Sequence, residues 1–176
     1  MPGAYPQQPG QGLPTEYGYT PYGTHPGMPG GLRVASMGNR FVARLVDGLI
    51  VGIPAMIVGF LLAGAIARSG GFLVSYLVLM LVFIGCYVVY DALMTGSQGA
   101  TVGKKVAGIR VIRVDGSPMD TGAGFTRAGI LMGAGVIPFL GGLVNLVMVL
   151  SPLFDGSGRN QGFHDKAAHT LVVSAQ

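Results

Sequence analysis

Residues 48–67 read GLIVGIPAMIVGFLLAGAIA and contain no Asp, Glu, Lys or Arg. Two further runs, residues 69–90 and 128–154, also lack these four residue types and are predominantly apolar. A helix needs about 20 apolar residues to cross the hydrocarbon core of a bilayer, and each run is long enough. The three runs predict an all-α integral membrane protein that contacts the lipid bilayer directly.

The composition of the whole chain supports this class. Of its 176 residues, half are hydrophobic and only 10% are charged, against about 25% in soluble domains. The single cysteine, Cys86, excludes a disulfide framework and a thiolate metal cluster, and its apolar surroundings predict a packed, inert thiol. Because the first apolar stretch begins near Phe41, behind a long polar segment, we do not expect a cleavable signal peptide.

The N-terminal segment has a different composition. Residues 1–31 contain seven Pro, eight Gly, four Tyr and three Gln, with a single charge at Glu16. Such a segment buries too little apolar surface to offset the entropy of ordering. We therefore expect a disordered tail over residues 1–35 and a membrane domain over residues 36–176. The tail is either simply solvated or uses its spaced tyrosines and prolines to contact a partner.

The first two helices are expected at about 40–67 and 72–94, joined by a turn so short that it forces an antiparallel hairpin. Pro54 predicts a kink in the first helix. Small residues recur in this helix about every four positions, a spacing that lets helix backbones approach closely in lipid; they are Gly48, Gly52, Ala55, Gly59, Ala63 and Ala67.

The distribution of basic residues predicts the topology. The loop at 95–127 has five of them, Lys104, Lys105, Arg110, Arg113 and Arg127, against Arg68 alone in the first turn. By the positive-inside rule this loop and the N-terminus are cytoplasmic. Within the loop, Val106–Val114 is β-branched and precedes a turn signal, and residues 170–173 are also strand-like. We predict that these two segments pair as a small cytoplasmic β element.

The third apolar run leaves three alternatives open. A third full crossing would place the C-terminus outside, yet Arg159 and Lys166 follow this run and indicate a cytoplasmic end. We expect a helix at about 125–154 that is broken near 138–142, where Pro138, Gly141 and Gly142 lie. It dips in and returns, makes two short crossings, or crosses once with a kink. The fold class is thus three to four transmembrane or re-entrant helices with the small β element.

Arg40, Arg44 and Asp47 lie on one face of the first helix, because their spacing places them within about 60° of one another. A carboxylate at the depth of Asp47 is costly unless it is paired or hydrated, and Arg44, three positions earlier, is its expected partner. One interpretation is a neutralised pair that orients the helix, with Arg40 reaching the headgroups. The other is a carboxylate that binds an ion or a proton.

Asp91, His164 and Asp165 are further candidates for a polar cluster. For Asp91, at the cytoplasmic end of the second helix, we favour solvation at the interface over membership of that cluster. His164 lies beside Asp165 and could report pH, but capping and hydrogen bonding to the polar loop is the favoured interpretation. With His169 it gives only a weak metal signal, so we expect no metal site.

The segment GATVGKK, residues 99–105, superficially resembles a phosphate-binding loop. It is one residue short of that motif, and no Ser or Thr follows the lysine. We therefore treat Gly99, Thr101, Gly103 and Lys104 as a structural loop motif. No nucleophile–base or paired-carboxylate arrangement is present in the sequence, so we expect no enzyme activity and no cofactor, and we expect no nucleic-acid partner.

Three ordered motifs resemble the RDD family of small bacterial membrane proteins. They are NRFVARLVD at 39–47, GATVGKK at 99–105 continuing into GIRV at 108–111, and FHDK at 163–166 followed by Thr170 and Val172. The resemblance covers about residues 36–174. It places the arginine and two aspartates of the family name on Arg40, Asp47 and Asp165, whereas Asp91 matches no named position. The proline-rich tail also resembles that of actinobacterial proline-rich antigens.

The resemblance implies a multi-pass protein of the bacterial plasma membrane. It also implies either transport of an unidentified ligand or sodium/proton exchange. Under this hypothesis Arg40, Asp47 and Asp165 form a polar cluster in which a carboxylate alternately binds a proton or a cation. So few spans would need a homo-oligomer or a membrane-protein partner to enclose a pathway. The alternative is a non-transporting scaffold whose tail recruits a partner.

Overall fold

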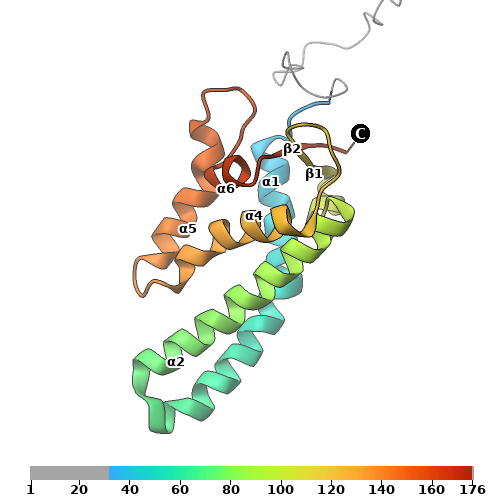
Figure 1. Ribbon diagram of the computed structural model, residues 1–176. Helices are drawn as coiled ribbons and strands as arrows, with labels where there is room; N and C mark the ends of the chain where they lie inside the picture. Colours follow the sequence, from blue (N-terminus) through green and yellow to red (C-terminus); the bar gives the residue numbers. More distant parts are fainter. Residues whose placement is uncertain (1–31, 176) are drawn as a thin grey trace, which may run out of the picture.

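The computed structural model describes residues 32–175, so the predicted disordered tail at residues 1–31 lies outside the described part. The described chain is mostly helical (Figure 1). The predicted domain boundary at residue 36 is slightly too late, because Val34 and Ala35 are already buried. Val34 forms a β-bridge with Val173, and this contact ties the start of the domain to its C-terminal strand.

The first helix consists of α1 (Met37–Asp47), a π-helical turn η2 (Gly48–Gly52) and the beginning of α2 (Ile53–Gln98). Pro54 lies in the first turn of α2, directly after the π-helical turn. A π-helical turn re-pairs backbone groups where an ordinary helix would be interrupted. At the position of the predicted kink, the helix therefore changes from π-helical to α-helical geometry just before Pro54.

The chain reverses inside α2 at Gly71, whose φ of 69° and ψ of 177° are accessible mainly to glycine. The reversal produces two antiparallel arms, 37–67 and 71–98, that lie side by side (Figure 1). The middle of the row of small residues faces the second arm, because a Cβ on Gly59 would come within 2.7 Å of the Leu79 side chain and Ala55 and Ala63 are buried. The predicted close packing thus occurs inside the chain over this part of the row, whereas Gly48 and Ala67 at its ends are not covered by the second arm.

Both arms are long and apolar enough to cross a membrane. Only 22% and 11% of the residues in their most apolar windows are buried inside the chain. A core helix of a water-soluble protein would be mostly covered, whereas these arms expose large side chains such as Phe41, Leu61 and Phe72. Contact with lipid or with another membrane protein accounts for such exposure.

The third apolar run is two short helices. Helix α4 (Thr121–Gly133) and the 3-10 turn η3 (Ala134–Val136) lead to a reversal around Phe139, which has φ 64°. Helix α5 (Gly141–Leu150) and the turn η4 (Ser151–Phe154) then return, and α6 (Phe163–Ala167) packs on α4 (Figure 1). The positive φ of Phe139 and the return of α5 beside α4 favour a run that reverses over a single kinked crossing (Figure 1).

The predicted β pairing is confirmed. Strands β1 (Ile109–Arg113) and β2 (Thr170–Ser174) pair antiparallel with Val111 opposite Val172. The predicted first strand was too long, because Val106 ends the short helix α3 (Val102–Val106). The inner side chains of both strands join Ala35 and Ala43 in a small buried core next to α1. This core fixes the C-terminal segment against the first helix.

Candidate functional site

The loop motif turns the chain back from the second arm toward α1. Gly99 caps the end of α2 with φ 71°, and Thr101 begins α3 with its hydroxyl accepting from the Lys104 backbone N–H at 3.3 Å. Threonine is a favoured residue at this capping position. The Val111 N–H donates to the Gly99 carbonyl at 2.7 Å and anchors the motif to β1. The motif is thus structural, as the sequence indicates.

Asp47 is almost fully buried and accepts three hydrogen bonds from neutral donors. These are the Tyr90 hydroxyl at 2.9 Å, the Thr101 hydroxyl at 2.6 Å and the Gly103 backbone N–H at 2.8 Å. The expected Arg44–Asp47 ion pair is absent from the described residues. That prediction was wrong because α3, a segment more than fifty residues away in sequence, supplies donors that hold the carboxylate away from its own helix.

Gly103 permits the close contact between α3 and α1. A Cβ at this position would lie 2.1 Å from the Ala43 carbonyl oxygen and 2.7 Å from the Asp47 carboxyl carbon. No side chain larger than a hydrogen fits between these backbones. The glycine therefore determines how deeply the loop motif seats on Asp47.

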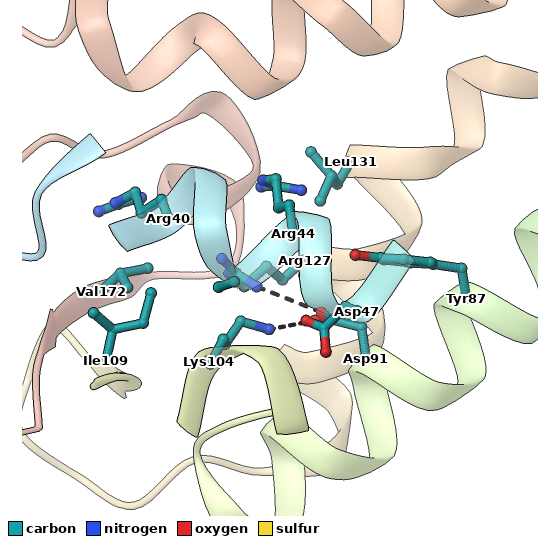
Figure 2. Close-up of a pocket in the computed structure, with 11 residues that line it drawn as sticks. Arg40, Arg44, Asp47, Tyr87, Asp91, Lys104, Ile109, Arg127, Leu131 and Val172 are labelled. Atoms are coloured by element: carbon teal, nitrogen blue, oxygen red, sulfur yellow. Dashed lines mark hydrogen bonds and ion pairs between the residues drawn. The ribbon is translucent and has the colours of Figure 1, made fainter. Parts of the chain in front are cut away.

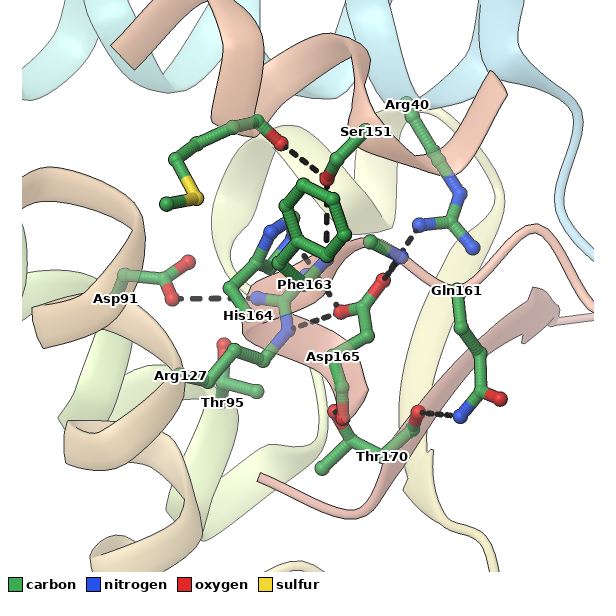
Figure 3. Close-up of polar contacts among 12 residues, drawn as sticks. Arg40, Asp91, Thr95, Arg127, Ser151, Gln161, Phe163, His164, Asp165 and Thr170 are labelled. Carbon is green, nitrogen blue, oxygen red and sulfur yellow. Dashed lines mark hydrogen bonds and ion pairs between the residues drawn. The ribbon is translucent and has the colours of Figure 1, made fainter. Parts of the chain in front are cut away.

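Asp165 is fully buried and bridges two arginines (Figure 3). Its carboxylate accepts from Arg40 Nη1 at 2.9 Å and Arg127 Nε at 2.8 Å. The Gly162 backbone N–H also donates to it at 3.1 Å. Arg40 is itself buried, so the expectation that it reaches the headgroups was wrong. Asp165 joins α6 to α1 and α4.

Asp91 is connected to Asp165 through Arg127. It lies 3.4 Å from Arg127 Nη1 and also binds Lys104 Nζ, and Lys104 in turn donates to the Thr95 hydroxyl at 3.1 Å. With 3% exposure, Asp91 is not solvated at an interface, so that prediction was wrong. We call the connected set the charge network; it comprises Arg40, Asp91, Lys104, Arg127 and Asp165.

Sequence reasoning missed Arg127, Thr95 and Tyr90. Arg127 was counted only as one of the basic loop residues, yet it bridges Asp91 and Asp165 at 3% exposure. Its position, at the edge of the third apolar run and within the first turns of a helix, was the available signal. Thr95 and Tyr90 carry no charge and lie in an apolar helix, so only their tertiary contacts identify them.

His164 is fully buried, and its two ring nitrogens have no hydrogen-bond partner. The favoured interpretation of capping and hydrogen bonding to the polar loop therefore fails for the His164 ring but holds for Asp165, which caps α6 through the Gly162 N–H and accepts from Arg127. Burial, reinforced by the charges of Arg127, Arg44 and Arg40, outweighs the attraction of Asp165 and lowers the pKa of His164 to about 3. The imidazole is neutral across the physiological range and does not act as a pH sensor there.

The pKa of Asp165 shifts in the direction that keeps it ionised. Burial opposes its negative charge, but the positive charges of Arg127 and Arg40 and the hydrogen bond from Arg40 outweigh burial and hold the pKa well below its usual range. Asp165 is therefore a permanent anion at the centre of the charge network. A group that must exchange protons near neutral pH needs a pKa closer to 7.

His164 predicts a pH dependence of stability. Its pKa is about 6.5 in an unfolded chain and about 3 in the fold. As the pH falls below about 6.5, only the unfolded state gains a proton, so the free energy of unfolding should fall by up to about 1.4 kcal/mol per pH unit. Thermal unfolding between pH 6.5 and 4.5 measures this slope.

A matched pair of variants assigns the slope to one residue. His164→Gln should remove it, whereas replacement of the exposed His169 by Gln should leave it unchanged. An equal slope in wild type and His164→Gln would contradict the neutral, buried state of the imidazole.

Arg44 has no hydrogen bond or ion pair from its guanidinium to any described residue. It lines a cavity of about 20 Å³, together with Arg40, Asp47 and Asp91 among others (Figure 2). This space suffices for a single water molecule. In Figure 2, Lys104 and Arg127 converge on Asp91, while Arg44 extends along the same side without an interaction. Arg44 is therefore the basic group of this region whose charge the protein does not neutralise directly.

No group of three or more His, Cys, Asp or Glu residues within 32–175 could hold a metal ion. Buried arginines, a lysine and aspartates dominate the site instead. Buried charges in a membrane-type helical bundle are costly and mark functional positions by default. The fold and site together define a membrane-type helical protein built around an ionic cluster.

The chain belongs to the RDD family, which it matches over residues 34–169. It is 31% identical over 150 residues to the uncharacterized protein YxaI of Bacillus subtilis (strain 168), an alignment that covers 76% of this chain and 93% of that relative. No solved structure is significantly similar. The family resemblance of the three sequence motifs is thus confirmed, and the motifs meet in space: α1 carries the first, α3 the second and α6 the third.

Proposed function

We propose that this chain is a small multi-pass transporter of the bacterial plasma membrane, with a cytoplasmic N-terminus, that binds an anionic ligand beside Arg44. The observation that carries the proposal is the guanidinium of Arg44, which lines the small cavity and also a groove of about 170 Å³ beside α1, and which has no counter-ion among residues 32–175. Basic groups around the site outnumber acidic ones by four to three; they are Arg40, Arg44, Lys104 and Arg127 against Asp47, Asp91 and Asp165. A bound anion would neutralise this excess charge.

Cation/proton exchange through Asp47 is less well supported by the contacts. Its carboxylate already accepts three hydrogen bonds from neutral donors. Asp91 and Asp165 are each bound by two cationic side chains. A cation site requires oxygens that are free to coordinate an ion. An anion, by contrast, needs hydrogen-bond donors, and Arg44 offers them.

Substitution of Arg44 tests the proposal. In proteoliposomes with an imposed gradient of chloride or inorganic phosphate, the wild-type protein should move the anion and Arg44→Gln should reduce the flux about tenfold or more. The reason is the loss of charge-assisted hydrogen bonds, worth about 1.5–3 kcal/mol. An anion-sensitive dye inside the vesicles follows chloride flux, and labelled phosphate follows phosphate flux. Arg110→Gln, which removes an exposed arginine of β1, is the matched control and should transport normally.

A sodium gradient with an internal pH-sensitive dye tests the competing mechanism in the same vesicles. Sodium-dependent proton movement that is lost in Asp47→Asn and retained in Arg44→Gln would support cation exchange and overturn the anion proposal. Asp47→Asn keeps one oxygen, which can still accept from Tyr90 and the Gly103 N–H because both donate to the same carboxylate oxygen of Asp47, so assembly should survive sufficiently for the assay.

A scaffold function is the second candidate. The observation that favours it is that the charge network joins α1, α2, α3, α4 and α6, which gives each of its five charged residues a structural role without transport. Absence of flux for all tested ions in a folded, reconstituted sample would favour this candidate. Crosslinking of the intact chain in native membranes, with and without residues 1–31, would then identify partners of the tail.

A further inference from the structure

A second space adjoins the two arginines of α1. A groove of about 170 Å³ lies between α1 and the α5–η4 segment, and its lining includes Arg40 and Arg44, which also line the small polar cavity. Apart from these arginines the lining is apolar and includes Phe41, Val149 and Leu153. The groove thus joins an apolar surface to the basic side of the charge network.

The polar part of the groove has unused hydrogen-bond donors. Arg40 donates through Nη1 to Asp165, but its Nε and Nη2 atoms are buried and have no partner. The Arg44 guanidinium has no hydrogen-bond or ion-pair partner within the part of the chain that the structure describes. The two side chains project from adjacent turns of α1 (Figure 2). Guanidinium groups bind the oxygens of a phosphate or carboxylate with short, strong hydrogen bonds.

The apolar side chains that line the groove are largely exposed. Phe41 is 66% exposed and Leu153 is 59% exposed, although both belong to segments of high hydropathy. A free inorganic anion would satisfy the arginines but leave this surface uncovered. A neutral lipid would cover the surface but leave the buried donors without a partner. A ligand that carries both an oxyanion and a hydrocarbon chain can bind the arginines and cover the apolar side chains at the same time.

We propose that this groove binds an acidic phospholipid. The phosphodiester accepts from Arg40 and Arg44, and the first methylenes of an acyl chain lie against Phe41, Val149 and Leu153. The volume is too small for a whole lipid, so the rest of the chain extends along the exposed helix surface. This inference rests on the proposed anion site at Arg44 and specifies its ligand as an anionic lipid that enters sideways from the bilayer.

Native mass spectrometry of the full chain in detergent tests the assignment. The probes are phosphatidylglycerol, phosphatidylcholine with the same acyl chains, and glycerol phosphate, which has the headgroup without chains. One phosphatidylglycerol per protein should remain bound, with an affinity about tenfold or more above that for phosphatidylcholine, whose choline cation cancels the phosphate charge and is repelled by the excess of basic groups around Arg44. Arg44→Gln should remove this preference, and Arg44→Lys should retain part of it because the charge is conserved.

A groove-filling substitution tests the apolar half separately. Val149→Phe leaves both arginines in place and should weaken phosphatidylglycerol binding about tenfold. Leu146→Phe adds a ring to an exposed position of α5 that does not line the groove, and it should have no effect. Thermal unfolding of each variant without lipid verifies that it folds.

The remaining outcomes overturn one proposal or both. Arg44-dependent binding of glycerol phosphate as tight as that of phosphatidylglycerol would leave the anion site standing and refute the lipid, because the acyl chain would then contribute nothing. Equal affinity for phosphatidylglycerol and phosphatidylcholine would also refute it. A change of oligomeric state in Val149→Phe would show that a second copy covers the groove. If no anion binds in an Arg44-dependent manner, both proposals fail.

Discussion

Replacing Asp165 with Asn is expected to lower the free energy of unfolding by about 3–5 kcal/mol, the cost of leaving buried charges uncompensated. Arg40 and Arg127 both donate to this carboxylate, at 2.9 and 2.8 Å, and both are buried. An asparagine of the same size keeps the shape and removes the charge. Thermal unfolding in detergent, followed by circular dichroism, measures the loss.

The matched control is Asp120→Asn. Asp120 pairs with Arg113 at 2.7 Å, but this ion pair is exposed, and its other oxygen caps α4 through the Ala123 N–H. Because asparagine also caps helices well, only the exposed ion pair is lost, at a cost of about 1 kcal/mol or less. Equal effects of Asp120→Asn and Asp165→Asn would contradict the central role of Asp165.

A double variant separates the orphaned charge from other effects of the substitution. Arg40→Met removes one of the two cations that Asp165→Asn leaves without a partner. The double variant should therefore be more stable than the sum of the two single losses predicts, as is usual for residues in direct contact. Strict additivity would mean that the two side chains do not interact.

Gly103→Ala is the second substitution with a large expected effect. The added methyl carbon would lie 2.1 Å from the Ala43 carbonyl oxygen, so α3 has to move away from α1. This movement breaks the Gly103 N–H contact to Asp47 and leaves the buried carboxylate with fewer donors. We expect a loss at the upper end of the range of about 1–3 kcal/mol typical of overpacking.

Gly129→Ala is the control for this substitution, because a Cβ there meets no atom within 4 Å. In a helix interior, alanine is favoured over glycine by about 0.5–1 kcal/mol, so this variant should be as stable as wild type or slightly more stable. Protease accessibility of the loop around residues 99–108 provides a second readout and should increase only in Gly103→Ala. A stable, protected Gly103→Ala protein would show that α3 does not seat tightly on α1.

Much of the architecture follows from local sequence patterns. Charge-free runs of about 20 residues have few folded solutions other than membrane helices, so both arms of the hairpin were predictable. The two glycines after Ser69 predicted the reversal, and Gly71 provides it. β-branched residues before a turn signal predicted the strand that pairs with residues 170–174. These features depend on hydropathy and backbone preference, which act over short distances along the chain.

The partners of the charged residues were not predictable in the same way. Sequence spacing pairs Arg44 with Asp47, its neighbour on the helix, but Asp47 instead accepts from a threonine and a glycine of α3. Asp91 was placed at a solvated interface, yet Lys104 and Arg127 reach it from two other segments. Burial decides these contacts, because a charge removed from water binds whichever donors the fold brings nearest.

The sequence by itself thus determined the membrane class, the hairpin, the strand pair and the three motifs that identify the family. Only the tertiary structure decided that those motifs meet, that Arg127 joins Asp91 to Asp165, and that Arg44 has no counter-ion among the described residues. The physical reason is distance along the chain. Helices and turns are specified by neighbouring residues, whereas an ionic cluster is assembled from segments as far apart as Arg40 and Asp165, which pair across 125 positions.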